Sequence, residues 1–108
     1  MKKLNWEWIA GFYEGEGSAG CYHNKRENRY HLKCTISQQN KNILNRIKSF
    51  VGFGSVCIAV RETGVYKWQA STNQARIFLN NVLPYLKTTH KKKQLLKALK
   101  RDRRFVNV

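Results

Sequence analysis

Two carboxylates stand close together in an otherwise basic chain. Glu14 and Glu16 lie in the segment IAGFYEGEG at residues 9–17, where a helix is expected to end. Carboxylates there meet the negative end of the helix dipole, at a cost of about 0.3–1 kcal/mol each, and they repel each other and any phosphate. A divalent cation reverses these penalties, and Mg²⁺ prefers oxygen ligands. The pair therefore predicts a metal site directed at a phosphate backbone, with a solvated turn as the alternative interpretation.

Small residues occur at helical spacing in the same segment. Gly11 and Gly15 are four residues apart and share one helix face, and Ala10 is adjacent to Gly11. Small residues let two helix backbones approach closely, which favours contact with a second copy of the chain. Packing of this helix on the chain's own sheet is the alternative interpretation.

The net charge is the strongest global feature of the sequence. The 108 residues include 21 Lys and Arg against 6 Asp and Glu, which gives a formal net charge of +15. A field of this size and single sign favours a polyanion, either nucleic acid or an anionic membrane surface. No apolar run approaches the roughly 18–20 residues that span a bilayer, and glutamates and glycines interrupt the N-terminal segment, which argues against a signal peptide. We therefore predict a nucleic-acid partner and no membrane association.

The chain has three cysteines, Cys21, Cys34 and Cys57. They are widely spaced and odd in number, they form no CxxC pair, and no histidine stands at zinc-site spacing. We expect three free thiols, an intracellular and reducing compartment, and no structural zinc.

The apolar pattern predicts the elements that must position these groups. Asn5 is an expected N-cap of the first helix, and Pro84 interrupts the third. Helices are expected at residues 5–17, 40–51, 73–82 and 90–103. Alternating polarity predicts strands at residues 18–26, 29–38, 55–61 and 65–71, with turns at 27–28 and 63–64.

The order of elements is therefore α-β-β-α-β-β-α-α in a single domain of residues 1–108, with a tail at 102–108 that is expected to fray. Antiparallel hairpins with helices on one face make an α+β fold with a four-stranded sheet. The uncovered face would carry polar and basic side chains, and Tyr66 and Trp68 would fill the core. Nine strand residues at ~3.3 Å each reach about 30 Å, long enough to follow a major groove. An ordinary solvated sheet face is the alternative interpretation.

The segment IAGFYEGEG resembles the LAGLIDADG motif of homing endonucleases, whose frequent variants read LAGFxDGEG. Ile9 replaces Leu, and Glu14 stands where Asp is usual. A strand follows the motif, and the order of elements over residues 5–99 also fits the family. The resemblance thus covers nearly the whole chain, and it implies the αββαββα LAGLIDADG fold of the single-motif, homodimeric type.

The resemblance implies a mechanism for site-specific cleavage of double-stranded DNA in intron homing. The motif helices of two subunits would pack together through Ala10, Gly11 and Gly15, which brings two copies of Glu16 side by side. Each Glu16, with the backbone carbonyl of Gly15, would bind Mg²⁺, for which Mn²⁺ would substitute, whereas Glu14 would support the helix end. The homodimer would hydrolyse one phosphodiester in each strand of a near-palindromic duplex and leave 3′ overhangs.

Further catalytic positions follow from the same resemblance. Gln38 matches a water-orienting Gln at the end of the second strand, with Gln39 as the alternative. The family places a lysine near the scissile phosphate, and its usual spacing falls here on Thr89. Lys91 fits if two residues are inserted, and Lys87 is another candidate. A solvated or phosphate-facing helix start is the alternative interpretation of the lysine run.

Strand parity nominates side chains of the uncovered sheet face for DNA contact. Arg and Lys suit guanine, and Asn and Gln suit adenine. The nominated residues are Tyr22, Asn24, Arg26, Arg29, His31, Lys33, Thr35, Ser37, Arg61, Lys67 and Gln69, with the small Cys57 and Ala59 on the same face.

Other functions compatible with the sequence are a non-cleaving DNA-binding regulator and an intron RNA-splicing maturase of the same family. Intact Glu16 and Gln38 argue against lost catalysis. A basic structural nucleic-acid protein is a further alternative, but it would have no need for the EGEG segment.

Overall fold

The computed structural model describes residues 4–27 and 29–106, with side chains described for 4–23, 25–27 and 29–101. The elements follow in the predicted order. The helices are α1 (Trp6–Glu16), α2 (Lys41–Val51), α3 (Thr72–Val82), the short 3₁₀ helix η1 (Leu83–Tyr85) and α4 (Thr89–Val106). The strands are β1 (Gly17–Asn24), β2 (Arg29–Gln38), β3 (Ser55–Val60) and β4 (Val65–Ser71).

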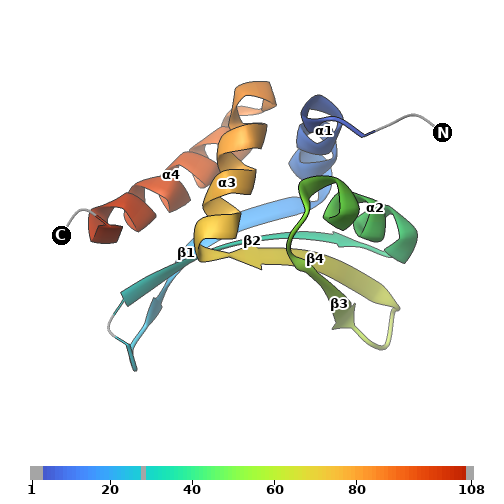
Figure 1. Ribbon diagram of the computed structural model, residues 1–108, viewed down its shortest axis with the longest axis horizontal. Coiled ribbons are helices and arrows are strands. Elements are labelled where there is room, and N and C mark those ends of the chain that lie inside the picture. The colour runs from blue at the N-terminus through green and yellow to red at the C-terminus, as the bar shows by residue number, and fades with distance from the viewer. Residues whose placement is uncertain (1–3, 28, 107–108) are drawn as a thin grey trace.

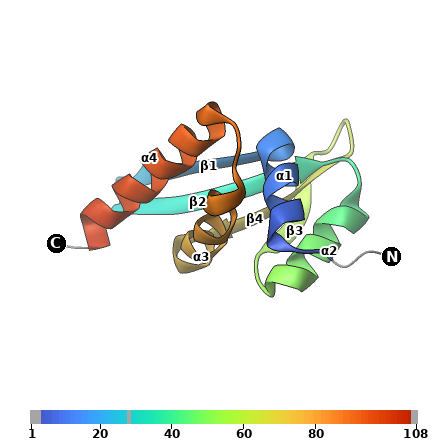
Figure 2. The same cartoon turned by 90° about the horizontal axis from the view of Figure 1, so that it is seen from above.

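The strands form one antiparallel sheet in the order β1-β2-β4-β3. All four α-helices lie on one face of this sheet, and both hairpins bend away from them, which leaves the opposite face open and concave (Figure 1). Seen from above, α1 lies between α2 on one side and α3 and α4 on the other (Figure 2). The α+β fold predicted from the sequence is confirmed. Within the described residues, none of the helices combines the length and the apolar character needed to cross a membrane.

Capping side chains fix where the first two helices begin. The Asn5 side chain accepts a hydrogen bond from the Trp8 N–H at 2.7 Å, and the Asn40 side chain accepts from the N–H groups of Asn42 and Ile43. These bonds satisfy backbone donors that a helix start leaves open. α2 ends at Gly52, whose φ of 86° suits glycine in the left-handed region.

The core forms between the sheet and the helices. Leu32, Cys34 and Ile36 alternate along β2 and are buried against the helix layer. Trp68 on β4 is fully buried, and its indole N–H donates to the Phe53 carbonyl at 3.1 Å. Burial raises the pKa of the Cys34 thiol to about 12, which keeps this thiol protonated.

Several predicted boundaries were wrong by a few residues. β1 ends at Asn24, and residues 25–27 form the turn. β3 ends at Val60, which pairs with Val65 at the start of β4, and residues 61–64 form the turn between them. α4 begins at Thr89 and continues past the predicted end at residue 103. Asn28, which was predicted in the first turn, lies outside the described residues.

The Tyr13 side chain is buried in this core with its hydroxyl oxygen unpaired among the described residues. Its ring meets Phe78 edge to face, so the apolar part is well packed. We expect Tyr13→Phe to raise the free energy of unfolding by about 1 kcal/mol. Burial removes the hydrogen bonds of the hydroxyl to water, and no bond within the described part of the chain replaces them, so the hydroxyl destabilises the folded state. Urea denaturation at fixed protein concentration measures this change. A lower stability would show that the hydroxyl has a partner, such as an ordered water.

Candidate metal site and nucleic-acid interface

The open face of the sheet carries polar side chains in cross-strand rows. One row crosses all four strands through Ser18, Thr35, Gln69 and Ser55. The next places Lys33 between Gly20 and Ser71. None of the four strands contains an acidic residue. The face is therefore neutral to basic, as a surface for a polyanion must be.

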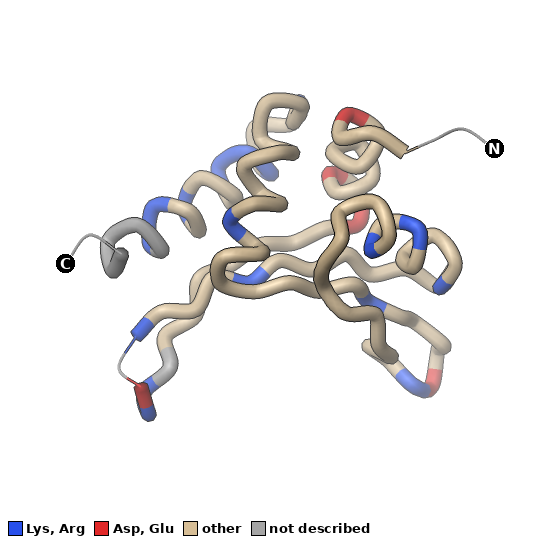
Figure 3. The backbone as a smooth tube through the Cα atoms, in the orientation of Figure 1, with Lys and Arg blue, Asp and Glu red and all other residues tan. Residues whose placement is uncertain are grey.

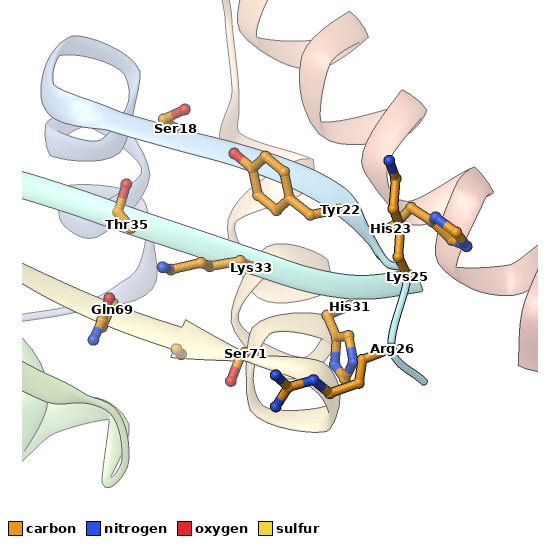
Figure 4. A pocket seen from close by; sticks show the side chains of 11 residues that line it. Ser18, Tyr22, His23, Lys25, Arg26, His31, Lys33, Thr35, Gln69 and Ser71 are labelled. Carbon is orange, nitrogen blue, oxygen red and sulfur yellow. The ribbon is translucent and has the colours of Figure 1, made fainter. Parts of the chain in front are cut away.

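A groove lies on this face near the β1–β2 hairpin (Figure 4). Six residues nominated from the sequence line it, namely Tyr22, Arg26, His31, Lys33, Thr35 and Gln69. Sequence reasoning missed Ser18, His23, Lys25 and Ser71. The parity that selected Tyr22 and Gln69 also covers Ser18 and Ser71, so these two could have been found. Lys25 lies in the turn, where no periodic signal exists.

The other residues nominated for DNA contact lie at other points along the strands. Ser37 pairs with Lys67, which pairs with Cys57, so these three share a row of the open face. Arg29 is exposed at the start of β2. The side chain of Asn24 lies outside the described part of the chain.

Two nominations at the end of β3 need correction. The pairing shift between Ile58 and Val60 breaks the alternation on which Ala59 and Arg61 were assigned. Arg61 lies in the turn after β3 instead of in the strand, and its carbonyl accepts from the Gly64 N–H at 3.4 Å.

Tyr22 presents its ring to the groove and is 59% exposed. A Cβ on Gly20 would stand 2.7 Å from the Tyr22 hydroxyl oxygen. In this conformation the ring lies along β1 and covers the position of Gly20, so a larger residue there would displace the exposed ring (Figure 4). Farther along the hairpin, His31 Nε2 lies 2.9 Å from the Glu27 carboxylate, which places one acidic group beside the groove.

The acidic side chains are concentrated on the motif helix. Glu7, Glu14 and Glu16 all lie on α1, whereas Glu27 and Glu62 lie in the two hairpin turns (Figure 3). Glu16 is the exposed last residue of α1, and Gly17 begins β1 opposite Ile36. The chain at Glu16 thus enters the sheet beside the end of β2.

Gln38 is the last residue of β2, at the same end of the sheet as Glu16. Its side-chain oxygen accepts from the N–H of Gln39 at 2.8 Å, and Gln39 itself is exposed. The Gln38 side chain thus has a hydrogen-bond partner in the adjacent backbone.

Glu14 has a different role from Glu16. Its carboxylate accepts hydrogen bonds from the backbone N–H groups of Thr88 at 2.7 Å and Lys87 at 3.0 Å. These hydrogen bonds hold the pKa of Glu14 below its ordinary value, and the bond from Thr88 has the largest effect. The Glu14 carboxylate is therefore occupied by the chain itself.

Lys91 reaches the same junction from α4. Its ammonium donates to the carbonyl of Gly17 and lies 5.7 Å from the centre of the Tyr13 ring. Lys87 is exposed, and Thr89 is the exposed first residue of α4. Of the candidate lysines, Lys91 is thus the one whose ammonium bonds to Gly17, the residue that follows Glu16.

The donor set at the end of α1 fits a hard divalent cation. Glu16 offers an exposed carboxylate, and the carbonyl of Gly15 belongs to the last turn of α1, where carbonyls have no partner further along the helix. Mg²⁺ accepts such oxygens and keeps several waters or phosphate oxygens. No group of three or more His, Cys, Asp and Glu side chains gathers in the described part of the chain.

The outward face of α1 is apolar and contains two glycines. Gly11 and Gly15 are exposed, and a Cβ built on either meets nothing within 4 Å. Trp8, 42% exposed, stacks on Phe12 with ring centres 5.3 Å apart. Ala10 was predicted to share this face, which was wrong: it is fully buried in the chain's own core.

Comparison with known proteins agrees with this architecture. The sequence profile of the LAGLIDADG endonuclease family matches residues 9–101. A curated relative, the intron-encoded DNA endonuclease ai2b of Dictyostelium discoideum, is 32% identical over 65 residues, which span 60% of this chain and 25% of that protein.

Solved structures share the fold. The homing endonuclease I-CvuI in complex with its target superposes with a TM-score of 0.77 at 23% identity, covering 97% of this chain and 69% of that one. I-GzeII in complex with a DNA target gives 0.80 at 22% identity, covering 99% of this chain and 38% of that one. The K262A mutant of I-SmaMI gives 0.82 at 19% identity, with coverages of 96% and 38%. With the motif, the fold and the profile in agreement, the chain belongs to the LAGLIDADG endonuclease family.

Proposed function

We propose that the chain is one subunit of a homodimeric, site-specific DNA endonuclease. It binds a near-palindromic duplex and cuts one phosphodiester in each strand with Mg²⁺, which leaves 3′ overhangs. The observation that carries this proposal is that the Lys91 ammonium donates to the carbonyl of Gly17, the residue directly after the exposed Glu16, where the motif helix enters a polar sheet. The two family members I-CvuI and I-GzeII were each solved with a DNA target.

The open face of the sheet is the proposed DNA-binding surface. β2 has ten residues, which at ~3.3 Å each reach about 33 Å along a duplex. The major groove admits a two-stranded ribbon, and the concave curve of the sheet suits the convex duplex. Arg26 and Lys33 would read guanine, and Gln69 would read adenine.

The catalytic work of the chain would fall to three side chains at the end of the sheet where α1 joins β1. Glu16, with the Gly15 carbonyl, would hold Mg²⁺, which when bound supplies an activated water and stabilises the leaving 3′-oxygen. Lys91, beside Gly17, would offset negative charge that develops on the phosphate. Gln38, at the end of β2, would orient water through its amide. Each chain has one such set, so cleavage of both strands requires two chains.

Selection of cleaved duplexes from a randomised library in Mg²⁺ tests this function. We expect cleaved molecules to share a near-palindromic site and to end in 3′ overhangs, and we expect EDTA to abolish recovery. A parallel selection for bound, uncut duplexes provides the comparison. Enrichment of a bound site that is never cut would contradict the nuclease and favour a DNA-binding regulator. Absence of any bound duplex would contradict DNA as the partner.

A further inference from the structure

The position of Glu14 is unfavourable for its own helix and favourable for another. The carboxylate lies in the last turn of α1, at the negative end of that helix dipole. It also accepts the N–H groups of Lys87 and Thr88, and the Thr88 carbonyl accepts from the Lys92 N–H at 3.1 Å, which opens α4. Glu14 therefore stands at the N-terminus of α4, where the helix dipole favours negative charge.

Lys91 shows the complementary arrangement. It lies in the first turn of α4, where a positive charge is unfavourable. Its ammonium turns back to the Gly17 carbonyl and lies over the Tyr13 ring. A Cβ on Gly17 would stand 2.3 Å from that ring, so the junction is closely packed. Glu14 and Lys91 thus tie α1 and α4 together on either side of Glu16.

The start of α4 depends on this tie. Leu86 and Leu95 are both buried, but residues 87–90 between them are exposed. The contact from Gln94 to the Ala19 N–H is long, at 3.4 Å. The two bonds that the Glu14 carboxylate accepts thus hold residues 87 and 88, which lead into Lys91, against the motif helix.

We propose that Glu14 is a positioning residue for Lys91. Its carboxylate docks the start of α4 on the motif helix and thereby holds the Lys91 ammonium at the carbonyl of Gly17, directly after Glu16 in the chain, without touching DNA or metal. The catalytic consequence rests on the proposed function, because it requires Lys91 to act on the scissile phosphate. The positioning itself is a property of the chain alone.

A double-mutant cycle on the single-turnover cleavage rate tests the coupling. We expect Glu14→Gln to lower the rate about 10- to 100-fold, because small displacements of a catalytic group have effects of this size. DNA affinity should not change. Lys91→Met should lower the rate about 100-fold, and the double variant should cut no more slowly than Lys91→Met alone. Glu14→Asp, which keeps the carboxylate, should restore most of the rate.

Two further measurements separate positioning from a general loss of structure. Glu7→Gln makes the same charge change on the exposed first turn of α1 and should cut at the wild-type rate. In the protein without metal or DNA, the NMR signal of the Lys91 side chain should move in Glu14→Gln and stay in place in Glu7→Gln.

The outcomes distinguish the two levels of the proposal. If Glu14→Gln and Lys91→Met slow cleavage additively, or if the Lys91 signal does not move in Glu14→Gln, positioning of Lys91 by Glu14 is overturned. If Lys91→Met cuts at the wild-type rate, the role of Lys91 in the proposed function is overturned, whatever the NMR signal shows.

Discussion

Replacing Glu16 by Gln is expected to lower the cleavage rate in Mg²⁺ by roughly 10³-fold or more. Gln has nearly the same shape but lacks the charge that would hold the cation. Glu16 is exposed at the end of α1, so its replacement should leave the fold intact. DNA affinity should be unchanged or slightly higher, because one negative charge is removed from a surface that would face phosphates in the proposed complex. Cleavage of a selected site, with affinity measured in Ca²⁺, checks both expectations.

Glu7→Gln is the matched control for this experiment, since it removes the same charge from the other end of α1. It should change neither rate nor affinity. Wild-type cleavage by Glu16→Gln would contradict the metal site. Loss of DNA binding together with cleavage would instead assign Glu16 a role in the structure of the interface.

The parts of the fold that depend on local patterns could be predicted from the sequence. β2 and β4 have the predicted bounds because alternate burial along a strand leaves a period of two in the sequence. Asn5 and Asn40 were predictable because an N-cap acts on N–H groups two or three residues away. The pairing shift near Ile58 was not predictable, because it arises between two strands and leaves no mark on either.

The candidate site shows the same division between local and distant contacts. Glu16 followed from the motif, but the choice among lysines did not, because it depends on how the segment before α4 meets α1. The bond between Glu14 and Lys87 joins residues 73 positions apart. Ala10 was misassigned because small size says nothing about direction. One residue along a helix turns the side chain by about 100°, and this turn separates the core from the face of Gly11.

That face of α1 leads to the second large expected effect. Gly11→Leu should let the single chain fold, because nothing lies within 4 Å of the new Cβ and Leu favours a helix over Gly by about 1 kcal/mol. The same side chain should hold two motif helices apart, and the dimer dissociation constant should rise about 10- to 100-fold. Double-strand cleavage should fall with it. Light scattering coupled to size exclusion, over a range of concentrations, measures the dimer.

Gln74→Leu is the matched control, since it adds the same side chain at an exposed position of α3 and should change neither association nor cleavage. Gly15→Leu should act as Gly11→Leu does, because the two glycines share one face with Trp8 and Phe12. The higher helix propensity of Leu should stabilise the single chain, whereas its larger side chain should weaken the dimer. A variant that is monomeric and still folded separates these two effects, because a folding defect would lower both the stability of the chain and its association. A Gly11→Leu protein that remains dimeric and cuts both strands would show that the two chains meet elsewhere, and that two copies of Glu16 need not lie together at α1.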